Sequence, residues 1–311
     1  MNKETIVKKS KDSFEILKNT VTNFMSNDPV SMAGTTAYFA IFSIAPILII
    51  IISVFGFFTD DQLIRSKLFS ELGGLIGNES TELLQTAIDN YEIGDKGLIG
   101  AIVGGVIFLI SATTLFGVMQ NSINYIWRVK VKSKLKQNIL KLLRDRLFSF
   151  GMILSLGFVV LISLIIDASL QIIRDFISDI LHADFGYLVN AANLVLTLIV
   201  VTAIFAIIFR FLPDVKVRWN AARFGAIFAA IMFFIGKYII GFIIGRSQLG
   251  AVYGAASSFV IILLWIYYVS IIFYFGVEIS RQFSKYYNHK NEPLNFAVPF
   301  EISTSLESTD D

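Results

Sequence analysis

The sequence predicts an all-α fold, a polytopic membrane protein with six transmembrane helices and cytoplasmic N- and C-termini. The chain of 311 residues is 55% hydrophobic and 16% charged, whereas soluble domains carry about 25% charged residues. Its uncharged stretches, such as residues 29–59 and 247–277, are long enough to cross a hydrocarbon core of about 30 Å, which takes roughly 20 helical residues. Lipid offers no partner to an exposed backbone N–H or C=O, so these spans must be helices.

The six predicted spans lie in a transmembrane domain at residues 29–285. They cover about residues 30–59, 97–124, 147–167, 187–211, 221–245 and 251–280. Most of the 26 Lys and Arg residues fall before the first span, between the second and third, between the fourth and fifth, and after the sixth. Because positively charged loops stay inside, this pattern places both termini in the cytoplasm. It also indicates attraction to anionic lipid and no role in binding nucleic acid.

Residues 1–28 precede the first span and predict a cytoplasmic amphipathic helix. Phe14, Leu17, Val21 and Phe24 recur at helical spacing, with Lys18 among them and further lysines before them. Such a helix either lies on the inner membrane surface or packs as a solvated helix on the bundle, and the pattern leaves both open. The pair at 28–29, Asp then Pro, predicts an N-cap followed by a first-turn proline.

The first span combines a proline with small residues. Pro46 frees the carbonyl of Phe42, and Ser43 lies near enough to offer a compensating hydroxyl, so we expect a kinked helix there. Ala33, Ala37 and Ala40 form a small-residue face that lets a second helix approach closely. The second and sixth spans are the expected neighbours.

The segments outside the spans carry their own signals. Residues 60–96 show helical spacing on either side of Gly73, Gly74 and Gly77, which predicts two short amphipathic helices. Beyond Tyr287 the chain is polar and then acidic, with two prolines. This composition predicts a disordered cytoplasmic tail at 286–311.

Three spans carry polar residues on one helical face, where burial in lipid is costly unless the residues face protein or water. We expect these stripes, with one lysine in the fifth span, to line a hydrated cavity that binds a ligand; the alternative is hydrogen-bonded packing between helices. The candidate ligand-binding residues are Thr114, Asn121, Asn124, Asn190, Asn193, Thr197, Lys237, Tyr267 and Ser270.

Two ionisable residues within spans need separate interpretation. Lys237 either extends toward the outer surface along its own stem or faces the cavity, where it could hold an anionic headgroup or pair with Asp167. Glu278 is near the inner end of the sixth span. Arg281, Arg223 or Arg146 could neutralise it, and we interpret it as structural.

Four sequence motifs resemble the YihY/BrkB family of bacterial inner-membrane proteins. They are "AYFAIFSIAP" in the first span, "SATTLFGVMQNSINYIW" from Ser111, "RFLPDVKVRW" from Arg210 and "YGAASSFVIILLWIYYVSIIFYFGVE" from Tyr253. The resemblance covers about residues 20–285 and implies six helices in the inner membrane. The matching structural motif positions, which the resemblance does not make catalytic, are Tyr38, Ser43, Pro46, Asn124, Trp127, Pro213, Trp219, Tyr253, Gly254, Trp265, Tyr267 and Glu278.

The family has carried the label of a ribonuclease, which these residues do not support. Metal-assisted phosphodiester cleavage needs His and carboxylate ligands around a metal ion. The two histidines, His182 and His289, fall on opposite sides of the predicted membrane. The sequence also has no Walker A motif and no GxSxG motif. We therefore expect a protein that is not an enzyme and has neither a cofactor nor a metal.

The function that fits these features best is binding or transport of a lipid or other amphiphile in the bacterial envelope. The expected partners are membrane lipids and envelope lipid-transport proteins; the sequence does not indicate an oligomeric state. Two alternatives remain. A scaffolding protein would use the polar stripes only for packing, and a small-solute channel would need them to run through the full membrane depth.

Overall fold

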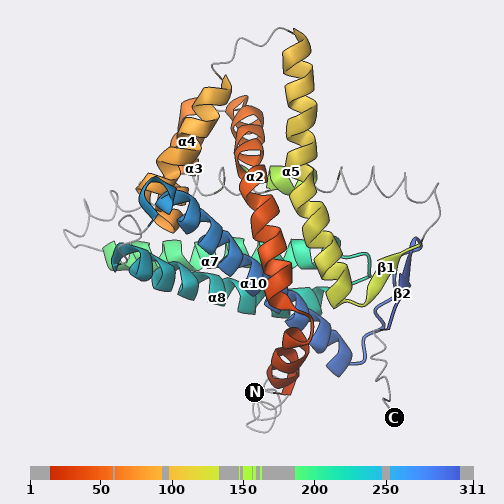
Figure 1. Cartoon of the computed structure of the whole chain (residues 1–311). Coiled ribbons are helices and arrows are strands. Elements are labelled where there is room, and N and C mark those ends of the chain that lie inside the picture. Colours follow the sequence, from red (N-terminus) through yellow and green to blue (C-terminus); the bar gives the residue numbers. More distant parts are fainter. Residues whose placement is uncertain are drawn as a thin grey trace, which may run out of the picture.

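The described part of the chain is mostly helical. The computed structural model describes residues 15–58, 60–92, 98–132, 186–246 and 253–301, with a few positions between 147 and 162. Its long helices are α2 (Pro29–Gly56), α5 (Leu98–Ile126), α7 (Gly186–Phe211), α8 (Trp219–Arg246) and α10 (Ser257–Tyr286), shown in Figure 1. A single turn of 3-10 helix, η1 (Gly254–Ala256), precedes α10. The predicted helical class is confirmed.

Four stretches are long and apolar enough to cross a membrane: Pro29–Gly56, Leu194–Phe211, Trp219–Ile243 and Ser257–Tyr286. These support a membrane protein. The predicted third span at 147–167 lies largely outside the described residues, so the count of six spans and the cytoplasmic termini stay predictions.

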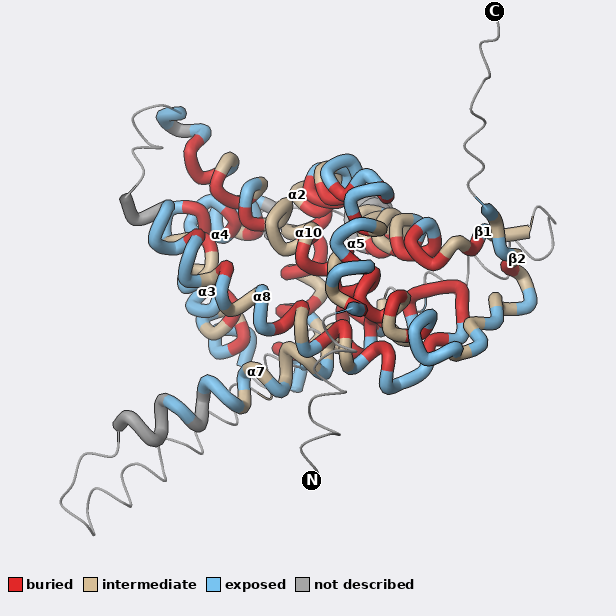
Figure 2. The backbone as a smooth tube through the Cα atoms, turned by 90° about the horizontal axis from the view of Figure 1, so that it is seen from below, coloured by how far each residue is buried: buried red, intermediate tan, exposed pale blue. Residues whose placement is uncertain are grey.

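The long helices pack in a chain of neighbours. α10 contacts both α8 and α2, α8 also contacts α7, and α2 contacts α5. Buried residues gather where these helices meet, while α7 is exposed over much of its length in Figure 2. Large apolar side chains such as Leu194, Ile199, Ile239 and Phe242 are exposed. Exposed apolar side chains of this kind suit a surface in contact with lipid.

The start of α2 forms as predicted. Asp28 has a positive φ of 52° and its side chain accepts a hydrogen bond from the backbone N–H of Ser31 at 3.4 Å. Pro29 occupies the first turn, where its missing N–H has no partner to lose. The small-residue face formed by Ala33, Ala37 and Ala40 is buried. This is expected where a neighbouring helix packs closely against α2.

Ser43 bonds differently from the prediction. Its Oγ donates toward the carbonyl of Phe39 at 2.9 Å and toward the carbonyl of Ser111 on α5 at 2.7 Å. Ser43 thus does not bond to the carbonyl of Phe42, as we expected. A serine in a helix reaches the carbonyl four residues earlier, which here is that of Phe39. Ser43 therefore ties α2 to α5.

Two short helices connect α2 and α5, as the spacing of residues 60–96 predicted. They are α3 (Asp61–Ile76) and α4 (Asn78–Glu92). Gly77 separates them with a φ of 81°, a conformation that glycine adopts without a steric cost. An ion pair between Arg65 and Asp89 at 2.6 Å joins the two helices.

Residues 15–25 form a helix before α2. Ile16, Thr20 and Phe24 are buried, and Phe24 meets Phe275 of α10 edge-on at 5.2 Å. Val21, which the sequence pattern assigned to the apolar face, is 49% exposed. Of the two arrangements that the sequence left open, the described contacts favour packing on the bundle.

The predicted disordered tail is wrong for residues 287–301, which we call the C-terminal strap. The strands β1 (Val129–Val131) and β2 (Ala297–Pro299) pair antiparallel. The strap also bonds to the turn between α7 and α8, since Leu294 N–H donates to the carbonyl of Asp214 at 3.0 Å. Composition predicted disorder because the segment lacks a core of its own, but backbone bonds to two other segments order it. Residues 302–311 lie outside the described part.

We expect acid to loosen the C-terminal strap. Burial, and then the positive charge of Arg218, hold the pKa of His289 below its ordinary value. The folded strap thus favours neutral His289. The resulting contribution to the stability of the strap is present above the pKa of the unfolded state, about 6.5, and is lost as the pH falls through the lower pKa of the folded state. The chain has no cysteine, so a spin label on Asn295→Cys should become more mobile below about pH 6.5.

His289→Gln is the control for this prediction. The labelled variant should show the same mobility at neutral and mildly acidic pH, because the titrating group is gone. A wild-type strap whose label mobility does not change over this range would contradict the prediction.

Candidate functional site

An apolar cavity of about 320 Å³ lies among the long helices of the described structure. This volume is at the lower end of the range for ligand pockets, about 300 to 1,000 Å³. Six helices contribute to its wall. The lining residues are Thr36, Ala40, Ile44, Ile47, Leu72, Ile76, Leu115, Phe116, Met119, Ile204, Phe205, Ile208, Phe233, Ile262, Trp265, Ile266, Val269, Ser270 and Phe273.

The cavity has two hydroxyl groups in its wall, and both already have partners. Thr36 bonds to the buried hydroxyl of Tyr274 at 2.5 Å and donates to the carbonyl of Met32 at 2.9 Å. Ser270 donates to the carbonyl of Ile266 at 2.8 Å. Because both hydroxyls are already hydrogen-bonded, a ligand in the cavity would contact mainly aliphatic and aromatic side chains.

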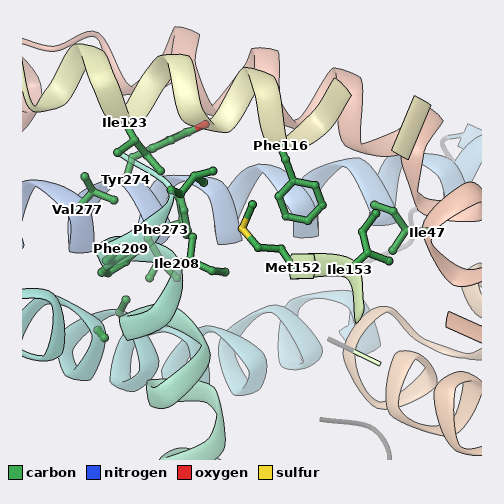
Figure 3. Close-up of a cluster of buried hydrophobic side chains, with 14 of the residues drawn as sticks. Ile47, Phe116, Ile123, Met152, Ile153, Ile208, Phe209, Phe273, Tyr274 and Val277 are labelled. Carbon is green, nitrogen blue, oxygen red and sulfur yellow. The ribbon is translucent and has the colours of Figure 1, made fainter. Parts of the chain in front are cut away.

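Aromatic side chains hold the wall in shape. Phe233 of α8 meets Trp265 of α10 edge-on at 5.7 Å, and Phe205 of α7 meets Phe273 at 6.2 Å. Figure 3 shows Phe116 of α5 pointing toward Met152, with Phe273 nearby. Edge-on contacts between rings add to the stability that apolar packing supplies.

The predicted polar stripes do not converge on this cavity. Of the predicted ligand-binding residues with described side chains, Ser270 alone is in the lining. Thr114 donates to the carbonyl of Ile110 at 2.6 Å, while Asn121 and Thr197 are exposed. Tyr267 is half-buried, and the side chains of Asn190 and Asn193 lie outside the described part. The described members of the stripes therefore do not give this cavity a common polar lining, and hydroxyls such as that of Thr114 bond to the backbone of their own helix.

Asn124 belongs instead to a buried cluster around Asp214, a residue that the sequence analysis missed. The Asp214 carboxylate is fully buried. It accepts hydrogen bonds from Asn124 Nδ2 at 2.8 Å and Gln120 Nε2 at 3.2 Å, and its backbone N–H donates to Asn124 Oδ1 at 2.8 Å. We call Asp214, Gln120 and Asn124 the Asp214 cluster. Amide donors on one α5 face thereby fix the turn between α7 and α8.

A second buried carboxylate, Glu278, ties α10 to the turn that follows the helix at residues 15–25, which we call the pre-span helix. It accepts hydrogen bonds from Gln282 at 2.5 Å and Asn27 at 3.1 Å, and pairs with Arg281 at 3.2 Å. Asn27 Oδ1 in turn accepts from Arg128 at 2.6 Å. We call Glu278, Gln282, Asn27 and Arg281 the Glu278 cluster.

Of the three arginines proposed for Glu278, the structure brings Arg281 to it. Arg223 bonds to Asn220, and Arg146 lies outside the described residues. Glu278 bonds to Gln282 and Arg281 within α10 and to Asn27 before α2, and none of these residues lines the apolar cavity, which suits its predicted structural role.

The remaining motif positions divide into buried and exposed groups. Trp265 lines the cavity, and Trp127 and Pro213 are buried. Gly254 has a φ of 54°, which explains a glycine there. Tyr38, Tyr253 and Trp219 are exposed, and Trp219 stacks with the guanidinium of Arg210 at 4.6 Å.

Metal chemistry receives no support from the described residues, where no three His, Asp or Glu side chains form a group able to hold an ion. His182 lies outside them, and the absence of a metal site stays a prediction.

Comparison with known proteins gives a consistent group of relatives. A sequence profile of the family described as "Virulence factor BrkB" matches residues 20–297. A UPF0761 membrane protein of Ralstonia nicotianae is 29% identical over 254 residues, 80% of this chain and 54% of that protein. One from Vibrio parahaemolyticus is 28% identical over 299 residues, 91% of this chain and 85% of the relative. The chain spans about half the length of some relatives. No solved structure matches it.

Proposed function

The chain belongs to the BrkB family of membrane proteins, and from this premise we propose that it binds a membrane lipid, placing one acyl chain in the apolar cavity. The proposal places a multi-pass protein without enzymatic activity in the bacterial inner membrane. The apolar lining of the cavity is the observation that carries it.

An acyl chain suits both the size and the chemistry of the cavity. If a methylene takes roughly the 30 Å³ that a water molecule occupies in the liquid, about ten methylenes fit. An unfilled cavity of this size costs on the order of several kcal/mol, because its lining loses packing contacts. Lipid chains are the apolar material that a membrane protein always has beside it.

The same lining favours a lipid chain over an ion or polar solute. Conduction needs polar groups along the path, whereas Thr36 and Ser270 are the two polar residues in this wall and both are hydrogen-bonded within the protein. Passage of a lipid across the membrane would require this binding step first. Any envelope partner protein would receive the lipid from, or deliver it to, this cavity.

A photoactivatable lipid tests the proposal. Phosphatidylglycerol with a diazirine in one acyl chain would be placed in nanodiscs with the protein and cross-linked by light. We expect labelling at cavity residues Met119, Phe233 and Trp265, identified by mass spectrometry. Ala40→Leu, which adds bulk to the cavity wall, should reduce this labelling several-fold relative to labelling of the exposed Ile239.

The matched control is Ala203→Leu, the same change at an exposed position of α7. It should leave cavity labelling unchanged. Labelling confined to exposed faces, or cavity labelling that Ala40→Leu does not alter, would overturn the proposal.

A further inference from the structure

A groove of about 380 Å³ lies between α7 and the described residues from 147 to 155, and we call it the α7 groove. Its described lining residues are Leu147, Gly151, Met152, Ser155, Ile207 and Phe211, none of which lines the apolar cavity. Ser155 is the polar residue among them, and its hydroxyl donates to the carbonyl of Met152 at 2.8 Å. A ligand in the α7 groove would therefore contact mainly apolar side chains.

Arg210 lies at one end of the α7 groove. It follows Ile207, which lines the groove, by one turn on the same face of α7. Its Cζ is 5.5 Å from the ring centre of Phe211, which also lines the groove. The ring of Trp219, the first residue of α8, is 4.6 Å from the same atom, and aromatic faces attract a guanidinium. These contacts place the Arg210 guanidinium where the groove reaches the C-terminal end of α7.

The Arg210 guanidinium has donors to spare. Nη1 donates to the carbonyl of Val217 at 2.5 Å, and Nε has no hydrogen-bond partner in the described structure. A guanidinium carries five N–H donors, and the side chain is half-buried, so a ligand can reach it. By contrast, Lys237, the cation predicted from the sequence to face a cavity, is among the described lining residues of neither hollow. A partly buried cation without an anion is costly, and an anionic group beside Arg210 would remove the cost.

We propose that the α7 groove and Arg210 bind a phospholipid, with an acyl chain along the groove and the phosphate on the guanidinium. The planar guanidinium suits a phosphate because it can donate to two oxygens at once. Trp219 is exposed, and exposed tryptophans concentrate at the level of the lipid headgroups, where this phosphate would lie. The site is separate from the cavity of the proposed function and does not depend on it.

A competing explanation gives Arg210 a purely structural role. Arg210 is in the last turn of α7, where a cation stabilises the helix end, and its bond to Val217 holds the turn before α8. Such a role does not depend on which lipid surrounds the protein. A phospholipid site, in contrast, prefers lipids that carry a phosphate over lipids that lack one.

The experiment compares two diazirine lipids with identical acyl chains in separate nanodisc samples, phosphatidylglycerol and diacylglycerol, which has no phosphate. Labelling of Ile207 is divided by labelling of the exposed Ile239. In the wild-type protein we expect this quotient to be about fivefold higher for phosphatidylglycerol, the effect of one arginine near an anionic lipid. Arg210→Gln should make the two lipids equal. Lys285→Gln, which removes an exposed lysine in the last turn of α10, should leave the preference unchanged.

Gly151→Leu tests the groove while keeping Arg210. A Cβ atom built on Gly151 has no atom within 4 Å, so the larger side chain can enter the groove without a clash at Cβ. It should reduce labelling of Ile207 by phosphatidylglycerol several-fold. Gly241→Leu is the matched control, because Gly241 on α8 is equally open, and it should leave labelling of Ile207 unchanged.

Three results would overturn the phospholipid site: equal quotients for the two lipids in the wild type, a preference that survives Arg210→Gln, or groove labelling that Gly151→Leu does not reduce. Labelling of the cavity residues Met119, Phe233 and Trp265 tests the function proposed above in the same samples. Loss of the groove preference with intact cavity labelling would overturn this inference alone.

Discussion

Asn124→Leu is expected to destabilise the folded protein by about 3 kcal/mol. The change removes the Nδ2 donor that lies 2.8 Å from the Asp214 carboxylate, and also the oxygen that accepts the Asp214 N–H. Both groups of Asp214 are inside the protein, so water cannot replace the lost partners without a local opening. Thermal unfolding of the purified protein in mild detergent, followed by tryptophan fluorescence, measures the loss as a lower melting temperature.

Asn121→Leu is the control, because Asn121 is three residues earlier on α5 and is exposed. On a lipid-facing surface a leucine is well tolerated, so the melting temperature should change little. Equal melting temperatures for the two variants would show that the Asp214 cluster contributes nothing specific to stability.

The sequence predicted the helices well because hydrophobic length and capping are local signals. Asp28 and Pro29 start α2, and Gly77 ends α3, through backbone preferences that depend on neighbouring residues. The C-terminal strap could not be predicted in this way. Its order comes from bonds to β1 and to the turn after α7, and such partners distant in sequence leave no local pattern.

The apolar cavity is harder to predict than the helices, because apolar residues occur in cavity walls and in ordinary core alike. Polar residues at membrane depth predict a wet interior, whereas in the described part of the chain Thr114 and Ser270 bond to their own helix and Asn124 bonds to Asp214. The cavity is lined by residues such as Phe233 and Ile204, which sequence alone cannot separate from ordinary core. The sequence does contain one signal for Asp214. A carboxylate that directly follows a proline at the end of an apolar run is a candidate partner for the side-chain amides of α5.

Glu278→Ala should be the other strongly destabilising change, by about 3 to 5 kcal/mol. Glu278 is fully buried, and removing it leaves Arg281 without its paired carboxylate and Asn27 and Gln282 without an acceptor. Because Asn27 lies in the turn between the helix at residues 15–25 and α2, that helix should loosen first. Hydrogen exchange of that helix, measured by mass spectrometry, should therefore accelerate. The melting temperature of the protein should fall.

Glu292→Ala separates a buried carboxylate from an exposed one. Glu292 also pairs with a lysine, Lys216 at 3.0 Å, but its side chain is 62% exposed, and exposed ion pairs contribute little to stability. Its removal should leave exchange of residues 15–25 and the melting temperature nearly unchanged. If Glu278→Ala behaved like Glu292→Ala, the pre-span helix would have to be held by its apolar contacts, such as Phe24 with Phe275, and the Glu278 cluster would have no part in positioning α2.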